Sequence, residues 1–278
     1  MEKVRGRQLE TKECRQIQLD ILCEIKAVCE RHDLRYILDY GSLLGAVRHG
    51  GFIPWDDDID ISMPRPDYEC FKEAFEKEQR ADTGIRLLTG MRENLALPYI
   101  QVVKENTITV KKGRRKAYAQ AVWVDVFPVD GADAGEKTEE IYRLYWEKIE
   151  EVRKIIGRYR PYRNPWKQLR QFYFHYIKKF RLGKIVREAE HLMQTLDYCA
   201  SDEVFCYQTI YGTREKNQKK YYEERIEMPF EGISCKVPRD YDEKLRGIYG
   251  DYEKIPPEEE RKGHEFAAYY QERKMKLQ

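Results

Sequence analysis

The sequence predicts an α/β protein with a mixed sheet and helices packed around it. Short runs in which apolar and polar residues alternate, the period of a strand, are interspersed with longer segments in which apolar residues recur at helical spacing. With 278 residues, the chain can form one large domain or a catalytic domain with a smaller lobe. We expect a sheet-containing catalytic core in residues 1–134, a helical segment in residues 135–202, and strands with a helix packing on the core in residues 203–278.

The first predicted element is an amphipathic helix from Leu9 to His32, whose expected role is packing. A strand from Tyr36 to Leu38 follows, and then Gly41 and Ser42 precede a short apolar helix from Leu43 to Val47. Ser42 is a natural N-cap for that helix.

The Gly-Ser pair has two interpretations. A glycine lets another backbone or a ligand approach closely, and the free N–H groups of a helix start form a seat for a phosphate. Arg48, at the end of the helix, is placed to add positive charge to such a seat. A plain turn has the same residues, so this feature alone leaves both interpretations open.

The next predicted strand carries a dense group of carboxylates. Asp58 and Asp60 alternate with Ile59 and Ile61, so the two aspartates lie on one face of the strand. Two adjacent carboxylates repel, and hard oxygen ligands at this spacing suit Mg²⁺ or Mn²⁺. The residues just before them, Asp56–Asp57, are interpreted as outer ligands or solvated groups. An acidic surface loop that merely ends in a strand is the alternative.

Residues 66–78 then predict a helix opened by a proline, and residues 85–88 and 99–103 predict strands. Lys104 follows the second of these strands, where it either reaches a phosphate or is solvated.

Asp125 is the candidate for a third metal ligand. It lies in the apolar strand Val122 to Phe127, where a charge is either buried and paired or coordinating. Metal-assisted phosphoryl transfer usually takes ligands from more than one strand. The alternative is an aspartate that caps a turn from Pro128 to Gly131, a role that Asp130 fits better.

In this order, a strand, Gly-Ser, a helix and Asp-x-Asp resemble the opening of the nucleotidyltransferase superfamily. The sequence GSLLGAVRHGGFIPWDDDIDI resembles the LicD family at nearly every position. The segment VDVFPVDG resembles the second signature of that family, and residues 237–264 resemble its closing segment. The resemblance implies a nucleotidyltransferase-type mixed sheet bearing Asp58, Asp60 and Asp125. It also implies metal-assisted transfer of a phosphorylated alcohol, often phosphocholine, from a CDP-activated donor to a glycan, with release of CMP.

The residues and the resemblance together suggest roles for individual side chains. Asp58, Asp60 and Asp125 would hold Mg²⁺ or Mn²⁺ and act in catalysis. Groups expected to bind the donor phosphates are Gly41, Ser42, Arg48 and Lys104. If the donor is CDP-choline, its quaternary ammonium needs an aromatic cage. Trp55 is the first candidate for this cage, with Tyr40 and Tyr68 behind it.

Three other functions stay open at this point. The donor alcohol can be ribitol, glycerol or ethanolamine in place of choline. The chain can be a nucleotidyltransferase acting on a small molecule or RNA, although the complete sequence of the signature, rather than its carboxylates alone, argues against this function. A catalytically silent binding protein has no need to hold three like charges together.

Residues 136–158 predict a long helix, and beyond it the composition changes. Residues 152–187 contain twelve Lys and Arg, no Asp or Glu and eight aromatic residues. Because the formal charge of the whole chain is only +2, the remainder carries about −10. Within this segment the apolar residues that recur at helical spacing are Trp166, Leu169, Phe172, Tyr173, Tyr176, Ile177 and Phe180.

This composition is typical of an interfacial helix that lies on an anionic membrane. The apolar residues are flanked by the cations Lys167, Arg170, Lys178, Lys179 and Arg181. A core helix with a basic solvated face fits as well. A nucleic-acid surface, which also combines cations with aromatics, is the less favoured interpretation.

The last third predicts strands at residues 204–211, 225–230 and 233–237, and a helix from Tyr241. Seven cysteines without a C-x-x-C pair indicate reduced thiols, and their spacing matches no common zinc site. No run approaches the length of a membrane span, and the first nine residues are charged where a secretory signal is apolar. We therefore expect a cytoplasmic protein, with the basic segment as a peripheral contact on the inner face of the membrane.

Overall fold

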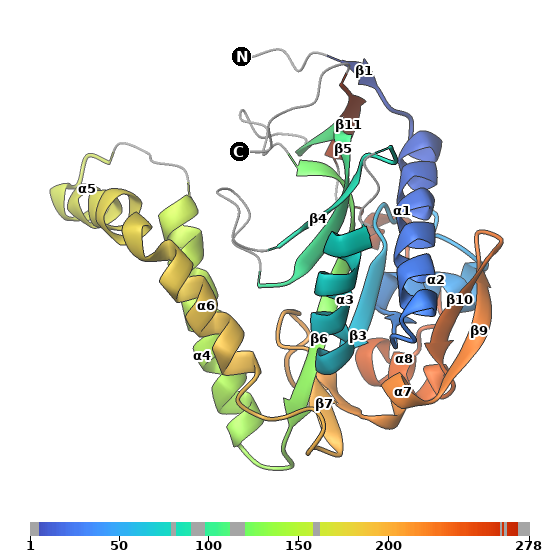
Figure 1. Cartoon of the computed structure of the whole chain (residues 1–278). Helices are drawn as coiled ribbons and strands as arrows, with labels where there is room; N and C mark the ends of the chain where they lie inside the picture. The colour runs from blue at the N-terminus through green and yellow to red at the C-terminus, as the bar shows by residue number, and fades with distance from the viewer. Residues whose placement is uncertain are drawn as a thin grey trace.

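The structure is a computed structural model that describes residues 6–78, 82–89, 98–111, 120–157, 162–261, 263 and 266–271. It confirms the α/β class: a curled mixed sheet lies between α1 on one side and a helical arm on the other (Figure 1). The helices are α1 Thr11–Arg31, α2 Tyr40–His49, α3 Arg65–Glu78, α4 Lys137–Ile156, α5 Pro165–Phe172, α6 Leu182–Met193, α7 Lys220–Glu223 and α8 Tyr241–Tyr249. The strands are β1 Arg7–Gln8, β2 Ile37–Leu38, β3 Asp60–Pro64, β4 Ile85–Leu88, β5 Ile100–Lys111, β6 Gln120–Ala132, β7 Glu203–Phe205, β8 Lys216–Gln218, β9 Arg225–Phe230, β10 Ile233–Pro238 and β11 Phe266–Tyr270.

The main sheet has the strand order β1-β11-β5-β6-β3-β2, with β4 on β5 and with β7 joining β6 to β8. Among the described strands, β3 and β6 form a parallel pair and the remaining pairs are antiparallel. β9 and β10 form a separate hairpin. The parallel pair matters for function, because its register sets Asp60 directly opposite Asp125.

The core lies between the sheet and α1. The apolar stripe of α1, with Ile21, Leu22 and Ile25, is fully buried against Val124 and Val126 of β6. Because successive side chains of a strand point to opposite faces, the alternate residues of β6 are directed away from this core. Those alternate residues include the aspartate at position 125.

Several predicted boundaries were wrong. β6 continues through residues 128–131, so the predicted turn there does not exist. Asp130 caps no turn: its buried carboxylate accepts hydrogen bonds of 2.7 and 2.6 Å from Arg65. The strand predicted from Asp58 begins at Asp60, and the one predicted at residues 204–211 ends at Phe205.

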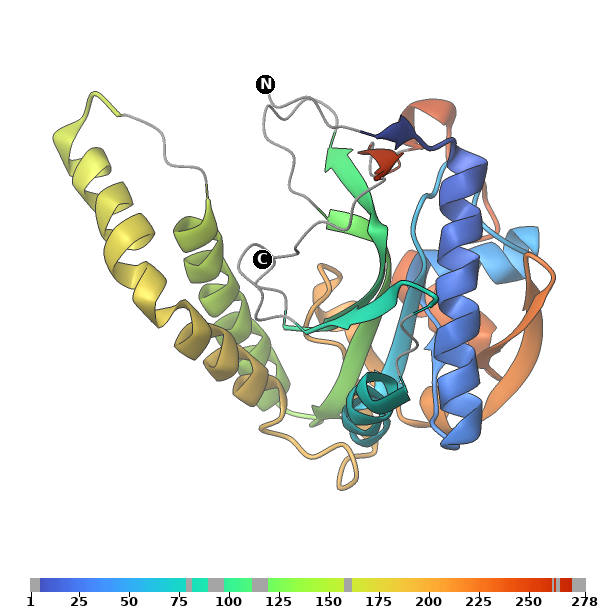
Figure 2. The ribbon, with the colours of Figure 1, turned by 45° about the horizontal axis from the view of Figure 1, so that its top comes forward.

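A helical arm projects from the sheet, seen at the left of Figures 1 and 2. It consists of α4, α5 and α6, with a π-helical turn at Tyr173–Ile177 and a 3₁₀ turn at Lys178–Arg181 joining α5 to α6. α4 and α6 pack on each other, with Tyr145, Ala189 and Met193 buried between them and β7. The helical segment predicted at 135–202 corresponds to this arm, although the division of the chain into three units stays a prediction.

Candidate active site

Three carboxylates converge at the start of the parallel strand pair. Ligand oxygens of Asp58, Asp60 and Asp125 all lie within 4.8 Å of one another. Asp60 opens β3 and Asp125 lies opposite it in β6, while Asp58 belongs to the extended residues that enter β3. The sequence analysis predicted this group, and the structure brings its members together.

Asp125 is oriented by two neighbours. Its Oδ1 accepts a hydrogen bond of 2.7 Å from the Gln101 side-chain amide, and its Oδ2 accepts one of 2.9 Å from the Trp123 indole N–H. Trp123 is two residues before Asp125 on the same strand face, and Gln101 is its cross-strand partner in β5. Because Asp125 is only 8% exposed, these donors hold a carboxylate that water reaches poorly.

Asp60 is held through its backbone. Its N–H donates to the Ser42 hydroxyl at 2.9 Å, and its carbonyl accepts from the Asp39 N–H at 3.0 Å. The predicted N-cap role of Ser42 was wrong, because α2 begins at Tyr40 and its N-cap is Asp39, whose carboxylate accepts from the Tyr40 N–H. Ser42 therefore links α2 to the strand that carries the metal-binding candidates.

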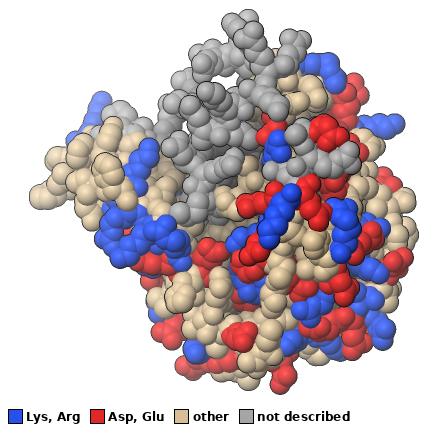
Figure 3. All heavy atoms as spheres, viewed as in Figure 1, with Lys and Arg blue, Asp and Glu red and all other residues tan. Residues whose placement is uncertain are grey.

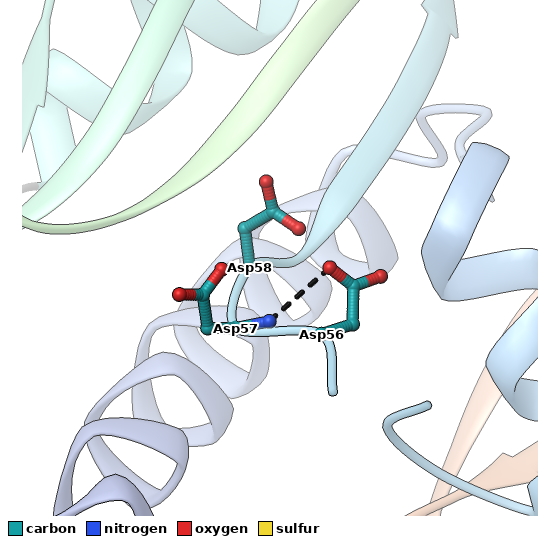
Figure 4. Close-up of side chains that lie close together, drawn as sticks. All are labelled: Asp56, Asp57 and Asp58. Carbon is teal, nitrogen blue, oxygen red and sulfur yellow. Dashed lines mark hydrogen bonds between the residues drawn. The ribbon is translucent and has the colours of Figure 1, made fainter. Parts of the chain in front are cut away.

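The loop before β3 adds a second acidic group. Asp56, Asp57 and Asp58 also have ligand atoms within 4.8 Å of one another, and the Asp57 N–H donates to Asp56 at 3.2 Å (Figure 4). α1 holds this loop: Arg15 donates to the carbonyls of residues 53, 54 and 56, and Gln18 to that of Asp57. α1 therefore positions the site as well as packing on the sheet. A cavity of about 560 Å³ beside it is lined by Arg15, Gln18 and Asp57, among others.

Gly41 lies in close contact with the acidic loop. A Cβ at this position of α2 would lie 2.5 Å from an Asp56 carboxylate oxygen, closer than side chains approach each other. The first turn of α2 therefore lies against the acidic group, as the phosphate-seat interpretation of Gly41 and Ser42 requires, although phosphate binding itself stays a prediction.

Burial, followed by the charges of Asp58 and Asp125, raises the pKa of Asp60 well above its ordinary value. Like charges at this distance favour a proton or a cation between them. The donor set is all carboxylate, and the hydrogen bonds that Asp125 accepts from Gln101 and Trp123 come from neutral donors. This chemistry fits a hard divalent cation such as Mg²⁺, which Asp58, Asp60 and Asp125 would hold.

The two cations predicted to bind the phosphates of the substrate, Arg48 and Lys104, lie apart from the carboxylates. Arg48 is six residues after Ser42 in α2, roughly 9 Å along the helix axis, and donates to the Tyr252 carbonyl. The Lys104 ammonium donates to the Thr83 carbonyl beside β4. Their predicted contacts with phosphate stay predictions.

Trp55 is surrounded by cations. The guanidinium carbons of Arg261 and Arg48 lie 4.9 and 6.0 Å from its ring centroid, and His49 packs edge-on against it. Two arginines at the ring make this a poor site for a further cation. The other two cage candidates, Tyr40 and Tyr68, are 4% and 3% exposed, so neither ring is open to a ligand in this structure.

A different set of aromatics lies beside the carboxylates. Phe127 follows Asp125 by two residues on the same face of β6, and the Tyr99 ring packs on it at 4.7 Å. Tyr211 and Tyr249 pack edge to face at 5.7 Å, with their hydroxyls 3.2 Å apart. The buried Tyr40 ring joins the pairs, at 5.7 Å from Phe127 and 5.8 Å from Tyr211.

These four aromatics, called the aromatic wall below, are Tyr99, Phe127, Tyr211 and Tyr249, and each is partly exposed. Burial and then the charge of Asp125 raise the pKa of Tyr99. Burial raises the pKa values of Tyr211 and Tyr249, and the charge of Asp60 adds a smaller contribution to both. The wall is therefore close to the carboxylates. Sequence reasoning missed it, because its members come from four distant segments, although the position of Phe127 was a usable signal.

A buried polar network supports the first turn of α2. The Lys244 ammonium of α8 lies 3.1 Å from Asp39 and 3.0 Å from the Tyr222 hydroxyl, and Lys244 and Asp39 are both fully buried. Beside them the Tyr40 hydroxyl donates to Glu215 at 3.1 Å. Burial raises the pKa of Glu215 to about 7, and Lys244 partly offsets the increase.

One known protein resembles this chain along most of its length, and others resemble parts of it. Residues 33–162 match the family model described as LicD/FKTN/FKRP, nucleotidyltransferase domain. The chain is 29% identical over 272 residues to the lipopolysaccharide cholinephosphotransferase LicD of Haemophilus influenzae, covering 95% of this chain and 99% of that protein. A 39-residue segment, 14% of this chain and 8% of the relative, is 51% identical to the human ribitol 5-phosphate transferase FKRP.

Proposed function

We propose, from the premise that this chain belongs to the LicD family and is a LicD-like phosphotransferase, that it transfers phosphocholine from CDP-choline to a hydroxyl of a cell-surface glycan or of its lipid-linked precursor. The main support for a metal ion and for choline as the alcohol is that the aromatic wall lies beside three converging carboxylates.

The reaction is a displacement at the phosphorus that bears the choline. The acceptor oxygen forms the new bond to phosphorus, the bond to the CMP oxygen breaks, and CMP leaves with the electron pair. The hydroxyl proton passes to a carboxylate of the acidic group, and Asp125 is the proposed acceptor. A divalent cation held by Asp58, Asp60 and Asp125 would neutralise charge on the diphosphate oxygens. Gly41 and Ser42, at the start of α2, are the proposed seat for the donor phosphates.

Choline is preferred to a polyol because of the wall. A quaternary ammonium has no N–H to donate and is bound by the faces of aromatic rings. Ribitol and glycerol carry hydroxyls that need hydrogen-bond partners. Of the four members of the described wall, Phe127 offers only ring surface, and the hydroxyls of Tyr211 and Tyr249 already share a hydrogen bond with each other. Ribitol remains the second candidate, since a segment of the chain is similar to a ribitol 5-phosphate transferase.

The test is release of CMP from a panel of CDP-alcohols in the presence of Mg²⁺ and a lipopolysaccharide acceptor. CDP-choline should be the preferred donor, and Phe127→Leu should lower kcat/KM for it by about tenfold, which corresponds to one cation–π contact of roughly 1 to 2 kcal/mol. The same variant should leave CDP-glycerol turnover nearly unchanged. Trp55→Leu is the matched control, because the Trp55 ring already faces two arginines. A preference for CDP-ribitol that Phe127→Leu does not alter would contradict the choline assignment.

Metal dependence is tested separately. Asp58→Asn and Asp60→Asn should abolish turnover, and the variants should be as stable as the wild type, or more so, in chelator because repulsion is relieved. The wild type should gain thermal stability when Mg²⁺ is added, and the variants should not. Equal affinity for CDP-choline with Mg²⁺ and in chelator would show that no cation bridges the diphosphate.

A further inference from the structure

The run of helix from Pro165 to Met193 has two apolar faces. One face packs inside the arm: Phe174 and Leu182 lie on a buried cluster formed with Val152 and Ile155 of α4. This contact explains how residues 165–193 attach to α4, but it buries only one face of that helical segment.

The other face is open to solvent. It consists of large apolar side chains at spacings of three and four, and they are exposed: Trp166 77%, Leu169 59%, Tyr173 42%, Tyr176 50%, Ile177 53% and Phe180 93%. The core-helix interpretation therefore does not hold for this face, because a core helix buries its apolar stripe. In Figure 3 the end of the molecule over α5 is largely tan, with Lys and Arg gathered beneath it.

Cations border the open face. Lys167, Arg170, Lys179 and Arg181 are exposed and form no ion pair with the described part of the chain. Lys178 differs from them: it is half-buried and pairs with Glu151 of α4. The predicted set of five membrane-facing cations is therefore corrected to four.

We propose that residues 165–181 dock the protein on the surface of an anionic lipid bilayer, with the open face among the acyl chains and headgroups and the four cations at the phosphates. Trp and Tyr concentrate at the membrane–water boundary, and helices with this arrangement of aromatics and cations lie in the interface plane. The absence of any acidic residue from 152 to 187 matches the charge of an anionic surface. None of the described helices is long and apolar enough to cross a bilayer.

Co-sedimentation with vesicles tests the proposal on the full chain without any substrate, so its outcome is independent of the proposed reaction. The protein should sediment with phosphatidylcholine vesicles that contain phosphatidylglycerol and stay in solution with phosphatidylcholine alone. Binding should weaken as salt rises from about 0.1 M to about 1 M, where the Debye length falls from about 10 Å to about 3 Å.

Two variants separate the contributions. Changing Lys167, Arg170, Lys179 and Arg181 to Gln should lower the partition coefficient by several hundredfold, roughly fivefold per cation. A matched variant with the same loss of charge elsewhere, at the exposed Lys12, Lys77, Lys137 and Lys254, should bind almost as the wild type does. Trp166→Ser with Phe180→Ser should also reduce binding, and both side chains are so exposed that folding should be unaffected.

Three results would overturn the proposal: equal binding to neutral vesicles, equal loss of binding in the two charge variants, or no binding at low salt. If the wild type instead forms a dimer in sedimentation velocity that Phe180→Ser dissociates, the open face is covered by a second copy of the chain. Binding to single-stranded RNA but not to vesicles would assign it to nucleic acid.

Discussion

Replacing Lys244 with methionine should destabilise the protein strongly and disturb the first turn of α2. Lys244 is fully buried, and its ammonium is the partner of Asp39 at 3.1 Å. Asp39 caps α2, and its N–H donates to the carbonyl of Asp60. The ion pair therefore lies one contact away from the proposed metal ligands.

The magnitude follows from burial. Removing one partner of a buried ion pair leaves an uncompensated charge and costs about 3 to 5 kcal/mol. In a chain of this size, each kcal/mol lowers Tm by roughly 2 to 4 °C, so Lys244→Met should lower Tm by roughly 10 °C. Asp39→Asn in the same chain removes the orphaned charge, and the double variant should therefore lose less than the sum of the single losses.

The assay is thermal unfolding at pH 8 followed by circular dichroism, with Lys254→Met as the control, since Lys254 is exposed and without an ion pair in the described residues. The control should change Tm by little. CMP release by Lys244→Met, measured well below its Tm, should fall as well, because the α2 cap is coupled to Asp60. A loss below about 1 kcal/mol would refute the reasoning, since it would mean that water or a proton compensates Asp39 at no cost.

Three further predictions concern the surroundings of the site. The raised pKa of Glu215 means that the folded protein holds this proton more tightly than the unfolded chain does. The free energy of unfolding should therefore fall by about 3 kcal/mol as pH rises from 4.5 to about 7. Denaturant titrations should show this decrease in the wild type and not in Glu215→Gln. Gly41→Ala should keep or slightly raise Tm, because alanine favours a helix. The same variant should lower CMP release by up to about a hundredfold, because the added methyl group displaces the Asp56 carboxylate. An unchanged rate would show that Asp56 takes no part. Trp123→Phe removes the N–H that holds Asp125 and should weaken Mg²⁺ binding, measured by calorimetry, by about tenfold or more. Wild-type affinity in that variant would mean that Gln101 alone orients the carboxylate.

Much of this protein could be predicted from local pattern. The long helices, the strands at residues 85–88 and 225–230 and the acidic trio all depend on residues close together in the chain, where spacing decides which face a side chain occupies. Asp58 and Asp60 share a face by their spacing, and Asp125 could be assigned to the trio because a lone charge in an apolar strand needs a partner.

Only the tertiary structure decided what surrounds those carboxylates. Gln101 reaches Asp125 because β5 and β6 pair in one register, and Lys244 reaches Asp39 across 205 positions because α8 packs on α2. The aromatic wall combines residues 99, 127, 211 and 249, which no local period connects. The open face of residues 165–181 has the same pattern as a core helix, and only its exposure in the folded structure distinguishes the two. Periodicity determines which side of an element is apolar, whereas the partner of that side depends on how distant elements pack.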